Sequence, residues 1–465
     1  MNLDTPHTSA LPRDTVILDG PESVTRAGGV TGLLSAFQEV LQREGPAVVV
    51  ATSGSTGRPK RTVLSTHALK SSAQATAEHL AAMLRHTHHQ PDHQLSSQPS
   101  HNPDQRHSQV PELSHGQQLS QAQPPSPDQQ LGHGQWLLCL PPFYVAGVQV
   151  LIRSVIARTT PVVLPDGPFT AQNFVTAAAR MTHPQRFVSL VPTQLQRLVD
   201  AAPNPTVRHT LRSFTAILLG GSAATPHLLE AAHALGANVI TTYGMSETAG
   251  GCVYDDLPLP GVSIHLEHTA DDDATSPGRI WLGGPMVTDG YLDDPAQTHR
   301  YVFDRLPDGV TSPSMTPTAP LDPATRWYRT DDLGVLTTSP RESSPRLRVI
   351  GRADDVMVTG GVKVSAGVLR NLMVAHPGVR DVVVVPVADP QWGQRIVAAL
   401  VPAKGTSTGT GSASLQEELR RLESTIRQEL GPAAVPKQWL WVPEIPLLPT
   451  GKPDRAAVME LFVKE

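Results

Sequence analysis

Hydroxyl-bearing side chains, glycines and one lysine alternate in the stretch "TSGSTGRPK", which follows an apolar run within the first seventy residues. These residues are Thr52, Ser53, Gly54, Ser55, Thr56, Gly57 and Lys60. Hydroxyls donate hydrogen bonds to an anion, and glycines let the backbone bend and approach it closely. The lysine adds one mobile positive charge. The chemistry that this combination suits is phosphate binding.

The stretch differs from the P-loop of nucleoside triphosphatases, which reads G-x-x-x-x-G-K-[ST]. Counted from Gly54, that pattern needs Gly at 59 and Ser or Thr at 61, where this chain has Pro59 and Arg61. The hydroxyl that would hold Mg²⁺ is missing, and Pro59 prevents a helix from starting directly at the loop. A different kind of phosphate loop is indicated.

Five further strings rich in glycine and charged residues follow. They are "LLGGSAAT", "TTYGMSETAG", "WYRTDDLG", "GRADDVMVTGGVKVS" and "PLLPTGKPDR". In this order, the six strings resemble the motifs of the acyl-adenylate-forming superfamily, which includes acyl-CoA synthetases, luciferases and peptide-synthetase adenylation domains. Its phosphate loop is written [ST]-S-G-[ST]-T-G-x-P-K-G, and Arg61 replaces the last glycine. The resemblance, which spans residues 46–455, implies an ATP-dependent enzyme that forms an acyl adenylate, releases pyrophosphate and passes the acyl group to a thiol.

The resemblance also implies which residues surround ATP, beginning with the phosphate loop. Those around adenine would be Gly220, Gly221, Thr242, Tyr243 and Gly244. Ser246 would lie near the phosphates, and Glu247 would hold Mg²⁺, a hard cation that a carboxylate suits. Asp332 would accept hydrogen bonds from the ribose hydroxyls, although the glycine that precedes it in the family pattern is Asp331 here.

The last two strings imply a moving C-terminal part. Arg352 would lie near the ribose and α-phosphate, and Asp354 would be the hinge. Lys452 would bridge the attacking carboxylate and the α-phosphate, where negative charge accumulates in the transition state. Three residues would serve coenzyme A, the co-substrate of the second half-reaction: Gly360 and Gly361, which leave room for its pantetheine arm, and Lys363, which meets an anionic part of it or is simply a surface lysine.

The stretch "WLLCLPPFYVAGVQVLIRSVIA" resembles L-P-x-x-H-I-[AS]-G-x-x-x-L-x-[RK]-S of the o-succinylbenzoate-CoA ligases of menaquinone biosynthesis, with Tyr144 in place of the histidine. An aromatic keto diacid needs an apolar wall and a polar partner for the carboxylate that does not react. The residues expected to line this acyl pocket are Phe143, Tyr144, Gly147, Gln149 and Arg153. Arg153 could instead cap a helix or pair with a surface acid.

Other functions remain open at this point. A ligase for another aryl or fatty acid would share every ATP motif. A peptide-synthetase-like module would need a carrier domain, which we do not expect because no such domain fits after Lys452. A relative that binds nucleotide without chemistry is disfavoured because Lys452, Glu247 and Asp332 are all present.

Apolar β-branched runs such as "PAVVVATS", "TAILLGG" and "DVVVVPVA" alternate with helical patterns, which predicts a layered α/β fold. We expect a large N-terminal AMP-binding domain over residues 1–353 and a small mobile α+β cap over residues 354–465. Residues 86–134 are dominated by His, Gln, Ser and Pro, so we expect a disordered insertion there. Its histidines have no regular ligand spacing.

The composition agrees with a small-molecule enzyme. The formal net charge is −5, which offers no basic field for nucleic acid, and the two cysteines, Cys139 and Cys252, suggest a reducing compartment. The N-terminus lacks the pattern of a signal peptide, and no apolar run approaches the roughly 20 residues that span a bilayer. We therefore expect a cytoplasmic protein whose partners are a carboxylic acid, ATP and coenzyme A; the sequence does not indicate its oligomeric state.

Overall fold

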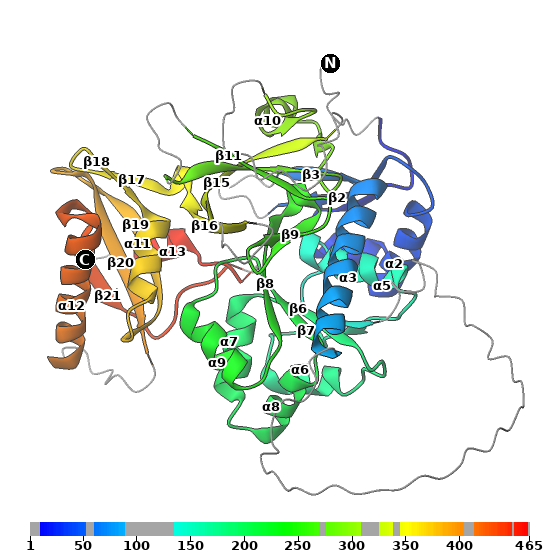
Figure 1. Ribbon diagram of the computed structural model, residues 1–465, viewed down its shortest axis with the longest axis horizontal. Coiled ribbons are helices and arrows are strands. Elements are labelled where there is room, and N and C mark those ends of the chain that lie inside the picture. The colour runs from blue at the N-terminus through cyan, green and yellow to red at the C-terminus, as the bar shows by residue number, and fades with distance from the viewer. Residues whose placement is uncertain are drawn as a thin grey trace, which may run out of the picture.

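The structure is a computed structural model, and it describes residues 10–52, 60–88, 134–268, 276–307, 325–337, 345–403, 413–448 and 451–463. Helices and strands alternate along these residues, and several separate sheets form, which confirms the predicted α/β class. Figure 1 shows the larger N-terminal part beside the smaller C-terminal part, whose outer face carries α12. Within the described residues, no helix has the length and apolar character needed to cross a membrane.

The first sheet carries the ends of the phosphate loop. Its strands, in spatial order, are β1 (Val16–Leu18), β2 (Pro46–Ala51), β3 (Arg61–Ser65) and β13 (Gly290–Tyr291). The valine run of β2 is buried on both faces, as expected for β-branched residues in a covered sheet. β2 and β3 are antiparallel, so the chain between them returns directly as a strand. Helices α1 (Pro21–Arg26), α2 (Gly29–Val40) and α3 (Thr66–His88) accompany this sheet.

Helix α3 extends to His88 and so includes the first three residues of the segment that the sequence predicted as an insertion. Gly134 and the strand that follows it are also described. Most of the predicted insertion, residues 89–133, lies outside the described residues.

The second sheet has seven strands. In spatial order they are β10 (Leu257–Pro258), β9 (Gly250–Tyr254), β8 (Val239–Met245), β7 (Ala216–Leu219), β6 (Arg186–Leu190), β4 (Gln135–Leu138) and β5 (Val162–Val163). The strands from β8 to β5 are parallel. Their helices are α5 (Val145–Ile156), α6 (Ala171–Ala178), α7 (Pro192–Ala201), α8 (Pro205–Arg212) and α9 (Pro226–Ala234). Side chains of Thr170, Asn204 and Thr225 cap α6, α8 and α9, which fixes where these helices begin.

The third sheet is antiparallel and leads to the C-terminal part. It comprises β11 (Ser263–Glu267), β12 (Gly278–Gly283), β14 (Val302–Phe303), β15 (Trp327–Thr337) and β16 (Arg346–Arg352). Helix α10 (Pro295–Tyr301) precedes β14. The pairing of β15 with β16 sets Asp332 opposite Arg352. Two expected ATP-site residues are therefore neighbours across one ladder.

The C-terminal part begins with the 3₁₀ turn η3 (Ala353–Asp355) and the hairpin of β17 (Val356–Thr359) and β18 (Val362–Ser365). Its larger sheet consists of β19 (Val379–Asp389), β20 (Gly393–Pro402) and β21 (Gln438–Trp441). The helices are α11 (Ala366–Val374), α12 (Ala413–Leu430) and α13 (Arg455–Glu460), with a short 3₁₀ turn η4 (Pro432–Ala434).

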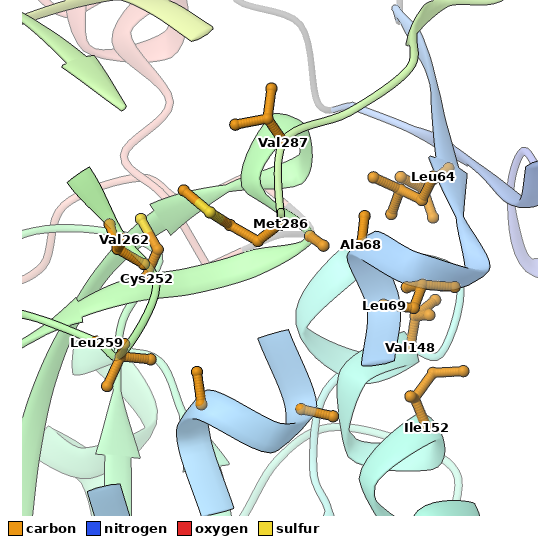
Figure 2. Close-up of a cluster of buried hydrophobic side chains, with 14 of the residues drawn as sticks. Leu64, Ala68, Leu69, Val148, Ile152, Cys252, Leu259, Val262, Met286 and Val287 are labelled. Atoms are coloured by element: carbon orange, nitrogen blue, oxygen red, sulfur yellow. The ribbon is translucent and has the colours of Figure 1, made fainter. Parts of the chain in front are cut away.

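Buried hydrophobic side chains form separate clusters on the two sides of η3. The clusters of the N-terminal part draw their members from residues up to Val349, and those of the C-terminal part from Met357 onward. Figure 2 shows part of the largest cluster, where Leu69 and Val148 pack between α3 and α5, and Cys252, Val262 and Met286 meet nearby. No buried cluster of the described residues crosses η3.

Candidate functional site

The two strands that flank the phosphate loop, β2 and β3, pair with each other in antiparallel fashion. The Thr52 N–H donates to the Lys60 carbonyl at 2.8 Å, and the Lys60 N–H donates to Thr52 Oγ1 at 3.2 Å. Strand β3 follows where a triphosphatase P-loop would continue as a helix, which agrees with the helix-blocking position of Pro59. The predicted ligands Ser53, Gly54, Ser55, Thr56 and Gly57 lie outside the described residues.

Lys60 projects over two aromatic rings. Its Nζ lies 4.7 Å from the ring centre of Tyr301 and 5.3 Å from that of Tyr291. Both distances are within the range of cation–π attraction. The lysine of the phosphate loop is therefore placed by tyrosines that come from β13 and α10, more than two hundred residues later.

Glu247 lies at the start of the short 3₁₀ turn η2 (Ser246–Thr248) and is 7% exposed. The Tyr291 hydroxyl donates to its Oε1 at 2.7 Å and lies 3.2 Å from the Tyr328 hydroxyl. Because the Tyr291 proton points to the carboxylate, Tyr328 donates to Tyr291. Burial, followed by the Glu247 charge, raises the pKa of both tyrosines, so they remain donors at neutral pH.

Glu247 is the residue expected to hold Mg²⁺, and its chemistry fits. A single buried carboxylate supplies the hard oxygen that Mg²⁺ prefers, and this ion usually takes its other ligands from water and substrate phosphates. Among the described residues, no group of three or more His, Cys, Asp or Glu side chains could hold a metal. Glu247 would thus serve as a single carboxylate ligand of the ion, with water and phosphate oxygens as its other ligands.

Asp332 is held from two sides. The Tyr243 hydroxyl donates to its Oδ2 at 2.7 Å, and Arg352 Nη1 lies 3.5 Å from its Oδ1. Burial raises the pKa of Asp332, while Tyr243 and Arg352 act in the opposite direction. Tyr243 and Asp332, predicted from separate motifs as adenine and ribose ligands, therefore meet directly.

Asp331, the departure from the family pattern, does not disturb this arrangement. Its carboxylate accepts a hydrogen bond from Arg279 Nη1 at 2.8 Å and another from the Tyr301 hydroxyl at 3.1 Å. The backbone stays within β15, and Asp332 keeps its partner on β16. The added carboxylate is therefore accommodated by its own cation.

Arg352 and Asp354 form a bidentate pair at the end of β16, with both N···O distances at 2.7 Å. Hydrogen bonding to Asp354 is the largest cause that raises the pKa of Arg352, so the guanidinium is always charged. Burial acts to raise the pKa of Asp354, but the bonds from Arg352 outweigh it and the pKa lies below its usual value. The predicted hinge residue is thus fixed to a predicted ATP-site residue.

Lys452 occupies a tight turn between β21 and α13. The Leu448 N–H donates to the Lys452 carbonyl at 2.8 Å, and Gly451 adopts a left-handed φ of 78°. A β-carbon at Gly451 would meet Val191 of the N-terminal part at 3.0 Å, so the turn packs closely against that part. This contact brings the C-terminal lysine to the site.

The charges that act on Lys452 belong to residues of the N-terminal part. Lys452 is exposed at the surface, but nearby protein atoms partly desolvate its ammonium group, which lowers its pKa. The Arg352 charge lowers the pKa further, whereas Glu247 and Asp332 raise it. The charges of Arg352, Glu247 and Asp332 therefore act on Lys452, as expected if they share a site with it.

The glycine-rich residues at the ends of β7 and β8 are also close together. A β-carbon at Gly220 would lie 2.3 Å from Thr242 Oγ1, and one at Gly244 would lie 2.1 Å from the Gly250 carbonyl. Gly221 has a φ of 83°, which favours glycine. Ser246 adjoins Glu247 in η2. These loops lie beyond the carboxyl ends of parallel strands, where open α/β sheets bind ligands.

The five residues predicted for the acyl pocket lie at the start of α5 or along it. The Phe143 and Tyr144 rings are 4.6 Å apart, and Tyr144 is the N-cap of α5. Gly147 faces the Pro141 carbonyl, which a β-carbon would approach to 2.2 Å, so it serves close packing. Gln149 is buried, and its Nε2 donates to the Ala249 carbonyl at 2.8 Å.

Arg153 neither caps a helix nor pairs with an acid among the described residues. It is 7% exposed, and its Nη2 donates to Thr76 Oγ1 at 3.0 Å and to the Tyr254 hydroxyl at 3.3 Å. Its guanidinium lies 5.0 Å from the Trp136 ring centre. Its Nε is buried and has no hydrogen-bond partner among the described residues. Such a cation is suited to bind an anion, because burial without a counter-charge is costly.

The residues predicted for coenzyme A stand apart from this cluster. Gly360 and Gly361 form the turn between β17 and β18, with φ values of 56° and 80°. Lys363 is exposed on β18. In Figure 1 the turn end of this hairpin lies at the outer edge of the C-terminal part. The structure therefore does not bring these three residues to the ATP-site cluster.

Several residues of the site were not predicted from the sequence. They are Tyr291, Tyr301, Tyr328, Arg279, Thr76 and Tyr254. One signal could have found four of them: the chain has only six tyrosines, and every one lies at the ATP-site cluster or at the predicted acyl pocket.

Known proteins share both parts of this chain. The AMP-binding enzyme family matches residues 110–292, and the AMP-binding enzyme C-terminal domain matches residues 371–452. A probable 2-succinylbenzoate–CoA ligase of Mycobacterium tuberculosis is 32% identical over 420 residues, covering 90% of this chain and 85% of the relative.

Two solved structures show a similar fold. The o-succinylbenzoate CoA synthetase of Bacillus subtilis, in complex with its acyl-adenylate intermediate, has a TM-score of 0.58 at 22% identity and covers 89% of this chain and 69% of that one. An amide bond synthetase of Marinactinospora thermotolerans has a TM-score of 0.61 at 23% identity and covers 90% and 70%. Since the second is named for an amide product, the fold does not decide the acceptor.

Proposed function

This chain belongs to the AMP-binding enzyme family, and on that basis we propose that it is an acid–thiol ligase that converts o-succinylbenzoate, ATP and coenzyme A to o-succinylbenzoyl-CoA, AMP and pyrophosphate. The adenylation step is supported by the contacts of Asp332 with Tyr243 and Arg352, and by the effect of the Glu247, Asp332 and Arg352 charges on Lys452 of the C-terminal part. The acid is supported by the relative of Mycobacterium tuberculosis and by Arg153.

In the first half-reaction, a carboxylate oxygen of the acid attacks the α-phosphorus of ATP, and the bond to the bridging oxygen of pyrophosphate breaks. Asp332, oriented by Tyr243, would accept hydrogen bonds from the ribose hydroxyls, and Arg352 would face the α-phosphate. Lys452 would bring an ammonium group to the oxygens that gain charge. Catalysis of this kind is mostly positioning and charge stabilisation.

Glu247 would hold Mg²⁺, which supplies charge neutralisation for the leaving pyrophosphate when bound. Tyr291 keeps the Glu247 carboxylate in one orientation, and the second oxygen has no hydrogen-bond partner among the described residues. That geometry suits a single inner ligand to a metal carried by the triphosphate.

The second carboxylate of o-succinylbenzoate would meet Arg153. The guanidinium is buried on α5 and is held by two neutral hydroxyls, so its charge is available to the substrate. A hollow on the other side of α3 residues Ser72 and Ala75 is lined by small and apolar residues, with Gly251 and Met286 among them, but Arg153 does not line it. An apolar wall with one cation is what an aromatic diacid requires.

The proposal is tested by pyrophosphate release from ATP and Mg²⁺ with a panel of carboxylic acids, with and without coenzyme A. We expect release with o-succinylbenzoate alone at a low level, and sustained turnover only when coenzyme A is added. Removing Mg²⁺ with a chelator should stop the low-level release and the sustained turnover alike. Sustained turnover with an amine and none with coenzyme A would reject the thiol acceptor.

An exposed feature of the C-terminal part fits the thiol acceptor. Trp392 is 39% exposed, Gly360 packs against its ring, and Lys437 Nζ lies 4.9 Å from the ring centre. A flat aromatic surface beside a lysine suits the adenine and phosphates of coenzyme A. In this structure the surface lies away from the ATP-site cluster, so it would reach the acyl adenylate by rotation about Asp354.

Replacing Trp392 by alanine or Lys437 by glutamate should raise the KM for coenzyme A by about tenfold. The burst of pyrophosphate in the absence of coenzyme A should not change, because adenylation uses other residues. Arg420→Glu, on the exposed face of α12, is the charge-matched control. An equal effect of the control would show a general electrostatic influence, and an altered burst would place Trp392 in the first half-reaction.

A further inference from the structure

Asp331 makes three polar contacts that a glycine could not make. Its carboxylate accepts from Arg279 at 2.8 Å and from the Tyr301 hydroxyl at 3.1 Å, and it lies 3.8 Å from Arg352 Nη2. Its side chain is 21% exposed. One side chain of β15 thus connects strand β12, helix α10 and the Arg352 guanidinium at the end of β16.

Two of these contacts help to fix the positions of Arg352 and Lys60, two cations of the ATP site. Arg352 has Asp331 on one side and Asp332 on the other, at 3.8 and 3.5 Å. The Tyr301 ring, fixed by its hydroxyl bond to Asp331, supports Lys60 at 4.7 Å. Tyr301 is buried, and this burial and the Asp331 charge raise its pKa, which keeps the phenol a donor.

A carboxylate near ATP would ordinarily repel the triphosphate. Here Arg279 neutralises Asp331, and it also donates to the Thr330 carbonyl at 3.0 Å, so the pair is fixed to the backbone of β15. Both partners are about one fifth exposed, which makes the pair stronger than a solvated surface ion pair. Asp331 therefore keeps its contacts with Tyr301 and Arg352, while the positive charge of Arg279 offsets its negative charge.

We propose that Asp331 is a positioning residue for ATP, which holds Arg352 directly and Lys60 through the Tyr301 ring, with Arg279 as the partner that makes its negative charge tolerable. The inference rests on the proposed function only where the KM for ATP is measured. The calorimetric affinity for Mg·ATP tests it through nucleotide binding alone. A glycine at this position, as in the family pattern, leaves both cations without this support.

The first experiment replaces Asp331 by glycine and by asparagine in the full chain. Asp331→Gly should weaken the calorimetric affinity for Mg·ATP and raise its KM by about tenfold, while the KM for the acid stays within about twofold. Asp331→Asn keeps an oxygen for Arg279, and its amide can donate to the Tyr301 oxygen, so it should lose less than about threefold. Conversion of presynthesised acyl adenylate to thioester should be unchanged in both. Asp304→Asn, an exposed carboxylate near Arg326, is the matched control.

A double-mutant cycle tests the role of Arg279. Arg279→Gln alone should raise the KM for ATP by about tenfold, because it leaves the Asp331 charge uncompensated beside the triphosphate. Adding Asp331→Asn to that variant should restore the KM to within about threefold of the native value. A merely structural pair would show no such restoration.

The outcomes separate the two proposals. Equal ATP affinity of the native protein and Asp331→Gly, at equal thermal stability, overturns the inference even if adenylation proceeds. Native protein that binds ATP but activates no acid overturns the proposed function, and the calorimetric comparison still tests the inference. If Asp331→Gly fails to fold, Tyr301→Phe, which keeps the ring and removes the hydroxyl, should raise the KM for ATP by about threefold, and no change would reject the link to Lys60.

Discussion

Replacing Lys452 by alanine should lower the rate of acyl-adenylate formation by about a thousandfold, because the ammonium group meets charge that develops only in the transition state. The thioester-forming step should keep at least about half of its rate when a presynthesised acyl adenylate is supplied. Single-turnover pyrophosphate release measures the first step, and coenzyme A consumption measures the second. Equal losses in the two steps would show that Lys452 does not act in adenylation alone.

The pH dependence gives this prediction an independent check. Burial and the Arg352 charge lower the pKa of Lys452, so the protonated form that adenylation needs is lost as pH rises through a value below the usual one of 10.5. The alkaline limb of kcat/KM for ATP should therefore begin below pH 10.5. Lys452→Arg should move that limb upward, since arginine stays charged. A limb that does not move would belong to another group.

o-Succinylbenzoate should exceed benzoate, succinate and octanoate in kcat/KM by at least about a hundredfold, which corresponds to roughly 2.7 kcal/mol of differential transition-state binding. Arg153 is the residue expected to supply most of it, as the partner of the second carboxylate. A methyl ester at that carboxylate should remove most of the preference in the native enzyme. Comparable turnover of octanoate would reject the acid while leaving adenylation untouched.

Arg153→Met separates recognition from folding. The substitution should reduce the preference for the diacid to below about tenfold and should raise the thermal midpoint, because a buried charge without a counter-ion is removed. Thr76 and Tyr254 can then pair with each other, since their oxygens are already 3.0 Å apart. The ester and the free acid should be used equally well by this variant. A lower midpoint would mean that Arg153 is chiefly structural.

Short-range motifs were sufficient to predict the α/β class and to select residues that the structure brings together. Tyr243 and Asp332 come from strings ninety residues apart and share a hydrogen bond, and Lys452 lies within the electrostatic reach of Glu247. Their catalytic roles stay predictions. What makes them visible in sequence is that each belongs to a glycine-rich or charged string in fixed order.

The supporting residues carry no such local pattern. Tyr291 and Tyr301 look like ordinary core residues until β13 and α10 fold beside Lys60, and the partner of Asp331 is Arg279, fifty residues earlier on another strand. Long-range packing decides these contacts. The same holds for Arg153, whose lack of an acidic partner among the described residues follows only from what surrounds α5.

The separation of the buried clusters at η3 affects how the C-terminal part can rotate. Because no apolar cluster of the described residues spans the boundary, the proposed rotation about Asp354 would uncover little hydrocarbon. It would exchange polar contacts, such as those around Lys452, for other polar contacts. The transition between the two half-reactions should therefore carry almost no heat-capacity change, and its balance should depend on ionic strength and bound phosphate rather than on temperature.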